Sequence, residues 1–436
     1  VRADDLSALA HNPGGISRLK GVNFFYNHTL DWLHLSFKRQ EKNFEVQDSD
    51  LEYGNPLATV HNEAELFPLG IMMGASSDFG TEDWTFAAGL FGPTAHGRLK
   101  FPVEGGQRYM LTELESVMLY YTLAAAYGNG EDYGCGLTLQ WVDMPTTRMS
   151  LVVDGTSGKP LSPYYSPPDV LATVDLEDRM SFTAALGGWW RIKPQWEVAA
   201  SVRAPIFINS TGDLSLENIP NHTDFLPEQL SLTNSSAALK LTLPLIARAG
   251  VRYVHLQGDE EVFDLELNVV YESWSMMKRF DLQMEGEINL YAATEVEDVV
   301  IDKNWRDTVS IRLGGTFNIS DQIAWSAGSF VENGAIPENY TNIDFVSFNR
   351  LGVGTGAHLN LGAFVINVAY MHIFQEDRNV DEDMAKLFQE RPVSACTPDT
   401  DEITCGSEPG LTGVPANAGQ YKSSIDMISL SAQARF

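Results

Sequence analysis

The sequence predicts an all-β fold, a 14-stranded antiparallel transmembrane β-barrel of the outer membrane. Three observations predict it. Apolar and polar residues alternate through about fourteen segments. Long and short connections alternate between these segments. The last segment ends the chain on an aromatic residue, Phe436.

Composition alone leaves a soluble all-β protein and a membrane barrel both open. The chain has 436 residues, of which 44% are apolar and 20% are charged. Its mean hydropathy of −0.14 fits a barrel, because only every second strand residue faces lipid. No run approaches the roughly 18 consecutive apolar residues that a spanning helix needs.

The chain is strongly acidic. Its 29 Lys and Arg against 58 Asp and Glu give a formal net charge of −29. This balance argues against nucleic acid as a partner, since phosphate binding needs a basic surface. We interpret the acidic residues as solvated surface charge, and recruitment of divalent cations stays open as the alternative.

The alternation is clearest in two neighbouring segments joined by a turn at Gly258. One face of the first segment carries Leu239, Leu241, Leu243, Leu245, Ala247, Ala249, Val251 and Tyr253. On the polar faces, Arg248 and Arg252 of the first segment lie opposite Asp264 and Glu266 of the second. In a barrel these charges would meet in the lumen, so we predict lumenal ion pairs among these four residues.

The same period-two pattern gives the predicted strands. They lie near 20–39, 66–78, 84–94, 109–127, 133–153, 177–193, 196–208, 235–256, 261–289, 306–318, 322–332, 347–359, 363–375 and 423–436.

The connections discriminate best between a barrel and a soluble sandwich. Six tight turns follow the even-numbered strands, and seven long connections follow the odd-numbered ones. Outer-membrane barrels have short periplasmic turns, long extracellular loops and an even number of strands. A soluble sandwich has no reason to keep this alternation, so the rhythm favours the barrel.

Aromatic residues gather beside the short turns, as an interfacial girdle would. They are Trp84, Tyr127, Tyr133, Trp189, Trp190, Trp196, Phe317 and Trp325. In the last segment, Ile428 to Phe436 alternates with polar residues. We expect this strand to close the barrel against the first strand near Val22 to Phe37.

The chain resembles the long-chain fatty-acid transporter (FadL) family. Residues 2–15, with Asp4 followed by Asn12 and Pro13, are similar to that family's amino-terminal hatch, although Gly14 stands where the family usually has Ala. Residues 239–244, 271–275 and 370–372 resemble its eighth, ninth and thirteenth strands. The resemblance therefore implies a hatch at 1–19 and a transmembrane barrel with seven long extracellular loops at 20–436.

Family hatches usually carry about twenty more residues before the Asp…Asn-Pro core, so the hatch is expected to be truncated here. The first residue is Val1 rather than Met, and we interpret the chain as processed or trimmed. Whether the missing residues were cleaved or are absent for another reason stays open.

The resemblance implies passive uptake of hydrophobic compounds, such as long-chain fatty acids, across a Gram-negative outer membrane. The implied partners are a hydrophobic small molecule or lipid and the surrounding outer-membrane lipid. In the family an inward kink of the third strand opens a side window. Phe91, Gly92 and Pro93 are the candidates here, because proline removes a ladder hydrogen bond. The alternative is that Gly92 and Pro93 simply end the strand.

Apolar residues in two otherwise polar loops are the candidate ligand groove. They are Tyr164, Tyr165 and Leu171 in the third long loop, and Leu214, Leu216, Ile219, Phe225 and Leu226 in the fourth. Exposed apolar groups of this density usually pack on something. A cap in which the two loops bury each other is the alternative. Cys396 and Cys405 are close enough in sequence to form a disulfide.

No catalytic motif is present, and the nine histidines do not show metal-ligand spacing. We therefore predict no enzyme activity, no metal site and no cofactor. The alternative function is that of a structural or interaction protein whose acidic extracellular loops dock protein partners, and an aqueous porin ranks third. The ligand and the oligomeric state stay open.

Overall fold

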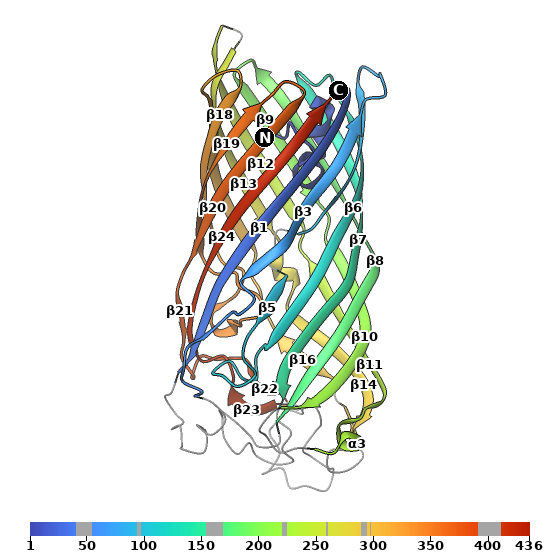
Figure 1. Ribbon diagram of the computed structural model, residues 1–436, viewed down its shortest axis with the longest axis vertical. Coiled ribbons are helices and arrows are strands. Elements are labelled where there is room, and N and C mark those ends of the chain that lie inside the picture. The colour runs from blue at the N-terminus through green and yellow to red at the C-terminus, as the bar shows by residue number, and fades with distance from the viewer. Residues whose placement is uncertain are drawn as a thin grey trace.

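The computed structural model describes residues 1–40, 55–93, 97–153, 169–219, 225–258, 260–288, 294–296, 298–390 and 411–436. They form a closed 14-stranded antiparallel barrel (Figure 1), which confirms the predicted fold class. No helix among the described residues is long and apolar enough to cross a membrane.

Several of the fourteen barrel strands are interrupted and are therefore made of two elements each. In chain order they are β1 (Val22–Arg39), β3 (Leu66–Ser77), β4 (Trp84–Phe91) with β5 (Arg98–Lys100), β6 (Glu113–Tyr127), β7 (Tyr133–Val153), β8 (Val170–Lys193), β9 (Trp196–Arg203) with β10 (Ile206–Asn218), β11 (Thr233–Leu243) with β12 (Ile246–Gln257), β13 (Glu260–Glu272) with β14 (Arg279–Ile288), β16 (Val299–Asp302) with β17 (Thr308–Asn318), β18 (Ile323–Glu332), β19 (Arg350–Asn360), β20 (Phe364–Gln375) and β24 (Gly419–Arg435).

The other elements are short. They are the helix α1 (Ala8–His11), the 3-10 turn η1 (Pro13–Arg18), β2 (Val60–His61), α3 (Pro227–Leu230), η2 (Trp274–Met276), β15 (Thr294–Glu295), η3 (Glu338–Tyr340), β21 (Arg378–Val380), β22 (Phe388–Glu390) and β23 (Leu411–Pro415).

The first and last strands close the barrel, as predicted. β1 pairs with β24 from Asn23 opposite Arg435 to Arg39 opposite Gly419. Beyond this ladder, Val22 and Phe436 exchange two backbone hydrogen bonds of 2.8 Å. Gly21 precedes them with a φ of +69°, and a side chain there would clash with the Phe436 carbonyl oxygen.

Tight turns lie at one end of the barrel and long connections at the other. The tight end, uppermost in Figure 1, also holds the carboxyl terminus. By the rule for outer-membrane barrels, this end faces the periplasm and the opposite end faces the outside. The predicted rhythm of short and long connections is therefore confirmed.

Two neighbouring strands are broken at prolines that lie opposite each other. Arg203 pairs with Ile246 and Ile206 pairs with Leu243, so Pro205 falls opposite Pro244. Neither residue has a backbone N–H, so the hydrogen-bonded ladder is interrupted between them. On the next strand the short turn η2 separates β13 from β14.

At this line of breaks the apolar side chains change from the outer to the inner face. On β8, Phe182 and Leu186 face outward, while beyond the boundary Asp175 and Glu177 do so and Val174 faces inward. The change occurs at Arg179 and Met180, beside irregular pairing with β7. Because lipid contacts apolar side chains and water contacts charged ones, the outer membrane surface lies here.

The sequence prediction of one continuous apolar face over residues 239–253 is therefore wrong. Leu239 is buried inside the barrel, whereas Val251 and Tyr253 lie on the outer face. The parity changes at Pro244 and Leu245, where the regular ladder is interrupted. A strict period of two continues only as long as each residue keeps its place in the ladder.

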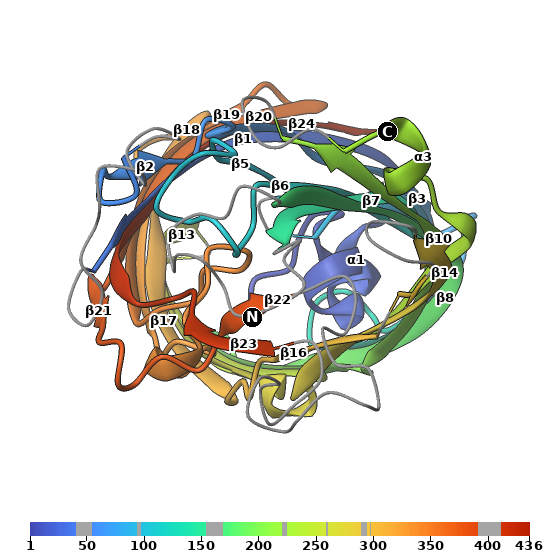
Figure 2. The same ribbon diagram turned by 90° about the horizontal axis from the view of Figure 1, so that it is seen from below.

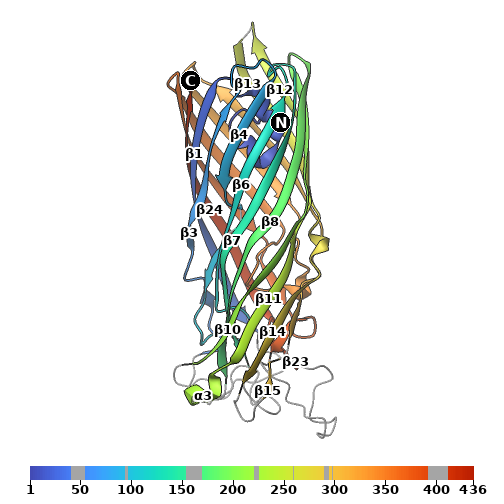
Figure 3. The ribbon, with the colours of Figure 1, turned by 90° about the vertical axis from the view of Figure 1, so that its right-hand side faces the viewer.

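On the extracellular side of this boundary, at the lower end of Figure 3, β7, β8, β10, β11, β14 and β16 continue as an extracellular extension. Its inner face forms an apolar cluster, the extension core. The residues are Val153, Val170, Ala172, Val174, Leu176, Leu214, Leu216, Phe225, Leu230, Ala237, Leu239, Met277, Phe280, Ile288, Val296, Trp305 and Ile336.

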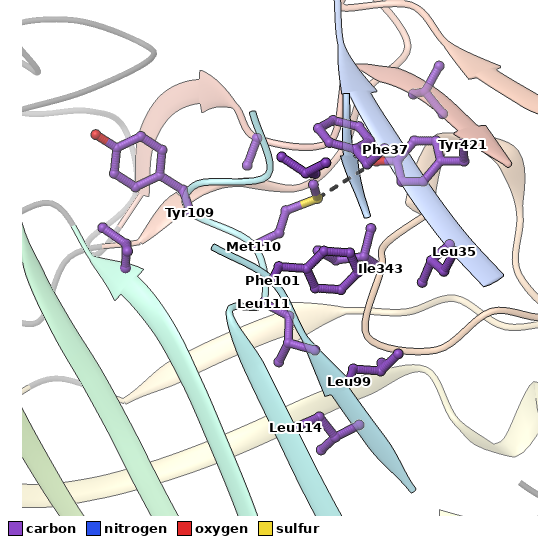
Figure 4. Close-up of a cluster of buried hydrophobic side chains, with 14 of the residues drawn as sticks. Leu35, Phe37, Leu99, Phe101, Tyr109, Met110, Leu111, Leu114, Ile343 and Tyr421 are labelled. Atoms are coloured by element: carbon purple, nitrogen blue, oxygen red, sulfur yellow. Dashed lines mark hydrogen bonds between the residues drawn. The ribbon is translucent and has the colours of Figure 1, made fainter. Parts of the chain in front are cut away.

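A second apolar group, the mouth cluster, lies at the extracellular end (Figure 4). It includes Leu35, Phe37, Leu99, Phe101, Met110, Ile343 and Tyr421. Beside it, Asp169 accepts hydrogen bonds from Arg108 (2.9 Å) and the Tyr109 hydroxyl (2.8 Å). Because Arg108 and Asp169 are both buried, removal of either partner would leave an uncompensated buried charge.

The position of the membrane boundary predicts how two substitutions on β8 will differ. Leu186→Arg places a charge among lipid tails and should destabilise the barrel by about 2–4 kcal/mol. Glu177→Arg lies on the same outer face in water and should change stability little. Reversible urea unfolding in lipid vesicles measures both, and equal losses for the two variants would contradict this placement of the boundary.

Candidate transport pathway

The amino-terminal segment, residues 1–19, lies inside the barrel near the periplasmic end (Figure 2). Leu6, Leu9 and Ile16 are fully buried against inward-facing residues of the wall, including Ala126 of β6 and Ile206 of β10. These residues form the lumenal cluster. Since apolar side chains of both the segment and the barrel wall are buried in this contact, the segment is packed into the lumen.

Small residues in the wall let the segment approach closely. A β-carbon on Gly187 would lie 2.2 Å from Asn12 Oδ1, and one on Gly136 would lie 2.3 Å from the Pro13 oxygen. Asn12 Nδ2 donates to the Gly188 oxygen at 3.2 Å, and Asn12 Oδ1 accepts from the Gly14 N–H at 3.1 Å. The Asn-Pro-Gly sequence is therefore held by backbone of β7 and β8.

One of the predicted girdle residues belongs to this contact instead. Trp189 is 4% exposed and donates from Nε1 to the Gly14 oxygen at 3.1 Å. The Arg18 guanidinium lies 3.6 Å from its ring centre. The assignment of Trp189 to the girdle is wrong because the odd residues of this part of β8 face the lumen. The other seven girdle residues are exposed: Trp84, Tyr127, Tyr133, Trp190, Trp196, Phe317 and Trp325.

Ion pairs fasten the other side of the segment. The buried Glu197 carboxylate accepts from Arg18 at 2.9 Å, from Arg191 at 3.1 Å and from Arg252 at 3.3 Å. Since Glu197 serves all three cations, its removal would leave buried charge uncompensated.

The structure brings three of the four predicted ion-pair residues into one network. Arg252 contacts Asp264 at 2.7 Å, and Asp264 also accepts from Arg2 at 3.3 Å. Glu266 accepts from the backbone N–H of Arg2 at 2.8 Å. Arg248 makes no ion pair with any residue of the described ranges. Asp4 of the segment accepts from Arg2 at 2.9 Å.

The third barrel strand is interrupted where Phe91, Gly92 and Pro93 were singled out. The β3–β4 ladder ends at Met72 opposite Phe91, and β5 resumes pairing with β6 in a register shifted by two residues. Phe91 itself is buried and stacks on Tyr120, with ring centres 5.1 Å apart. A side opening at this interruption stays a prediction.

Inside the extracellular extension lies a narrow cavity of about 50 Å³. Its lining consists entirely of apolar residues: Met149, Leu151, Val153, Ala172, Val174, Leu214, Leu216, Leu239, Phe280, Leu282, Met284, Val296, Val299 and Ile301. Outside this wall, Arg148 and Asp175 form an exposed pair at 2.9 Å. The extension therefore encloses an apolar space with water outside.

The predicted groove residues are divided by the structure. Leu214 and Leu216 line the cavity, and Phe225 is buried in the same core. Leu171 and Ile219 instead pack in the mouth cluster, and Leu226 is exposed. Tyr164, Tyr165, Cys396 and Cys405 lie outside the described residues.

Sequence reasoning missed the cavity wall on β7, β14 and β16. Met149, Leu282 and Ile301 face the cavity from these strands. Met149 and Leu282 lie in predicted strands, but alternation alone does not show that the apolar side turns inward beyond the membrane boundary, and Ile301 lies outside every predicted strand.

A larger and shallower hollow lies on the outside of the barrel. Six polar residues line part of it, namely Glu332, Asn333, Asn349, Arg350, Gln375 and Glu376. Four of its apolar residues, Ile311, Val331, Leu351 and Phe374, occupy one transverse row across β17 to β20. All four are exposed below the extracellular rim. Since such side chains face lipid tails, this hollow belongs to the membrane contact surface.

The closed barrel, its occupied lumen and its apolar extracellular cavity define an outer-membrane transport channel. The chain belongs to the outer membrane protein transport protein family (OMPP1/FadL/TodX), whose model matches residues 1–400. Members of this family are outer-membrane channels for hydrophobic compounds, so the resemblance and the localisation predicted from the sequence are confirmed.

Solved structures agree in fold. A Pseudomonas aeruginosa FadL homologue is 15% identical, with a TM-score of 0.72 over 99% of this chain and 94% of that one. The P. putida toluene transporter TodX is 12% identical, with a TM-score of 0.66 over 99% and 94%. The Ralstonia pickettii toluene transporter TbuX is 12% identical, with a TM-score of 0.61 over 99% and 93%. No curated protein matches the chain.

The glycine contacts predict that a single methyl group will disturb the amino-terminal segment. Gly187→Ala should displace Asn12 and open the lumen, which would raise single-channel conductance in planar bilayers. Gly354→Ala is the matched control, because its β-carbon would lie 3.2 Å from the nearest atom, the Tyr370 oxygen. Conductance unchanged in both variants would contradict a tightly packed segment.

Proposed function

We propose that this channel captures hydrophobic compounds in the cavity of the extension core and passes them through the barrel wall without an energy source. The observation that carries the proposal is the apolar lining of that cavity on the water-exposed side of the membrane. Burial of an apolar molecule there is favourable by about 25 cal/mol per Å² removed from water.

The described side chains offer a continuous apolar route towards the membrane. Leu241 packs against both the extension core and the lumenal cluster. The lumenal cluster reaches Phe91, where the third strand is interrupted. We propose that the ligand leaves sideways at Phe91, Gly92 and Pro93, because an apolar molecule gains more from entering lipid than from entering the periplasm.

Residues 1–19 act in this proposal as a hatch that blocks the aqueous route. Asn12 and Pro13 hold the hatch on the glycine surface of β7 and β8. Asp4 and Arg2 connect it to Asp264. Since polar solutes would have to displace these contacts, the proposal favours hydrophobic cargo over a general porin.

The cargo is a hydrophobic small molecule, either a long-chain fatty acid or an aromatic hydrocarbon. Both kinds of name occur among the similar structures, a FadL homologue and two toluene transporters. Their titles describe those proteins, and the common requirement is an apolar binding space.

Filling the cavity should abolish capture. Ala172→Trp projects an indole into the cavity and should lower uptake of a labelled hydrophobic compound by roughly tenfold, or about 1.4 kcal/mol of binding. Ala238→Trp is the control, because Ala238 lies on the outer face of β11 opposite Thr211. Folding is verified by the mobility of unheated protein on gels. Normal uptake by folded Ala172→Trp would refute capture in this cavity.

A further inference from the structure

The barrel wall beside the cavity is interrupted on one edge of β11. The ladder between β11 and β14 ends at Lys240 opposite Asp281. The next backbone hydrogen bond between the two edges is donated by the Ser273 N–H at 3.0 Å. Between these points, no backbone hydrogen bond of the described chain joins residues 242–244 to residues 274–278. We call this stretch the wall gap, and side chains rather than strand pairing close it.

The wall gap lies at the level of the membrane surface. Pro244, at its edge, marks the change of the apolar side chains from the outer to the inner face. On the periplasmic side Tyr271 is exposed on the lipid-facing surface, and on the extracellular side Arg279 and Asp281 form an exposed ion pair at 2.8 Å. Met276 is exposed between them. An apolar side chain of the gap therefore lies where lipid tails meet water.

Buried aromatic side chains fill the inner side of the wall gap. The ring centre of Trp305 lies 5.2 Å from that of Trp274 and 6.0 Å from that of Phe280. Phe345 contacts the same indole, with ring centres 5.5 Å apart. Trp305, Phe280 and Met277 are buried in the extension core. Since Phe280 also lines the cavity, these side chains stand between the cavity and the membrane surface.

Trp305 is the side chain of this group that can leave its place at the lowest cost. Trp274 Nε1 donates to Glu272 at 2.8 Å, whereas the buried Nε1 of Trp305 has no hydrogen-bond partner among the described residues. Lys303 and Asp344 nearby form a buried ion pair. Breaking that pair would leave a buried charge uncompensated, while movement of the Trp305 indole breaks only apolar contacts.

The cavity is too small for a cargo molecule while these side chains are in place. Its volume is about 50 Å³, and an apolar cavity that binds benzene in another protein has about 150 Å³. Part of the lining must therefore move when cargo enters. Along the cavity β7, β8, β10 and β11 are joined by continuous ladders. The wall gap is the part of the lining that can move without breaking a ladder.

We propose that the wall gap is an entry port through which hydrophobic molecules dissolved in the outer leaflet reach the cavity when Trp305 moves aside. This inference rests on the proposed function and adds a membrane source of cargo to capture from water. The path is apolar throughout, since Met276 faces lipid and Phe280 faces the cavity. The port is separate from the interruption at Phe91, which belongs to the lumenal cluster.

A photoreactive phospholipid tests the port, because it cannot leave the membrane. The protein is reconstituted into vesicles that contain a phospholipid with a diazirine near the end of one acyl chain. After irradiation, labelled residues are identified by mass spectrometry. Leu282, which lines the cavity, should be labelled in the wild type. Phe37 is the matched control, because it is buried behind the continuous ladder of β1 with β24 and should stay unlabelled.

Removal of the Trp305 indole gives a second measurement. Trp305→Ala should increase the labelling of Leu282 and raise the initial rate of uptake of a labelled hydrophobic compound by roughly tenfold, or about 1.4 kcal/mol in the equilibrium between closed and open port. Trp325→Ala should keep the wild-type rate, because Trp325 lies on the lipid-facing surface away from the cavity. The mobility of unheated protein on gels verifies that both variants fold.

No labelling of Leu282 in either protein would overturn the port. Equal labelling of Leu282 and Phe37 would overturn it too, since the lipid would then have entered without the wall gap. In both cases capture from water, which Ala172→Trp tests, would stand. A wild type that takes up no hydrophobic compound would instead overturn the proposed function itself.

Discussion

Alternation along each strand is the constraint on which the rest of this structure depends. In a closed barrel every residue faces either outward or inward, and one irregularity exchanges the two sets. Here the exchange occurs at Arg179 and Met180 of β8, at Pro205, and at Pro244. On the periplasmic side of that line apolar residues face lipid, and on the extracellular side they face the inside of the extension. The membrane boundary and the apolar cavity of the extension are thus two consequences of one change of parity.

Different strands of the lumen wall make different kinds of contact with the amino-terminal segment, residues 1–19. Glycines of β7 and β8 receive the Asn12–Gly14 backbone, whereas Glu197 and Asp264 on the neighbouring strands receive its arginines. The small residues therefore leave room for the backbone of the amino-terminal segment, and the buried carboxylates determine how the segment is oriented.

The strands, their number and their closure were predictable, because period two, the connection rhythm and Phe436 depend on local sequence. The placement of Leu214, Leu216 and Phe225 near one another was also within reach, as apolar residues in polar loops. The inward orientation of Leu239 was not predictable, because it depends on whether the regular strand pairing continues through Pro244. Trp189 was missed for a related reason: two adjacent tryptophans give no sign of which one faces lipid. That Arg248 makes no ion pair within the described ranges depends on the side chains of its neighbouring strands, which no linear pattern contains.

We propose that an apolar ligand occupies the extracellular extension, inside the barrel wall. Crystals of the protein soaked with a long-chain bromoalkane test this most directly, because anomalous scattering locates the bromine without interpretation of weak lipid density. We expect a bromine peak between Leu216 of β10 and Leu282 of β14, within the cavity they line. Peaks confined to the lipid-facing surface, such as the hollow at Leu351 and Phe374, would contradict it.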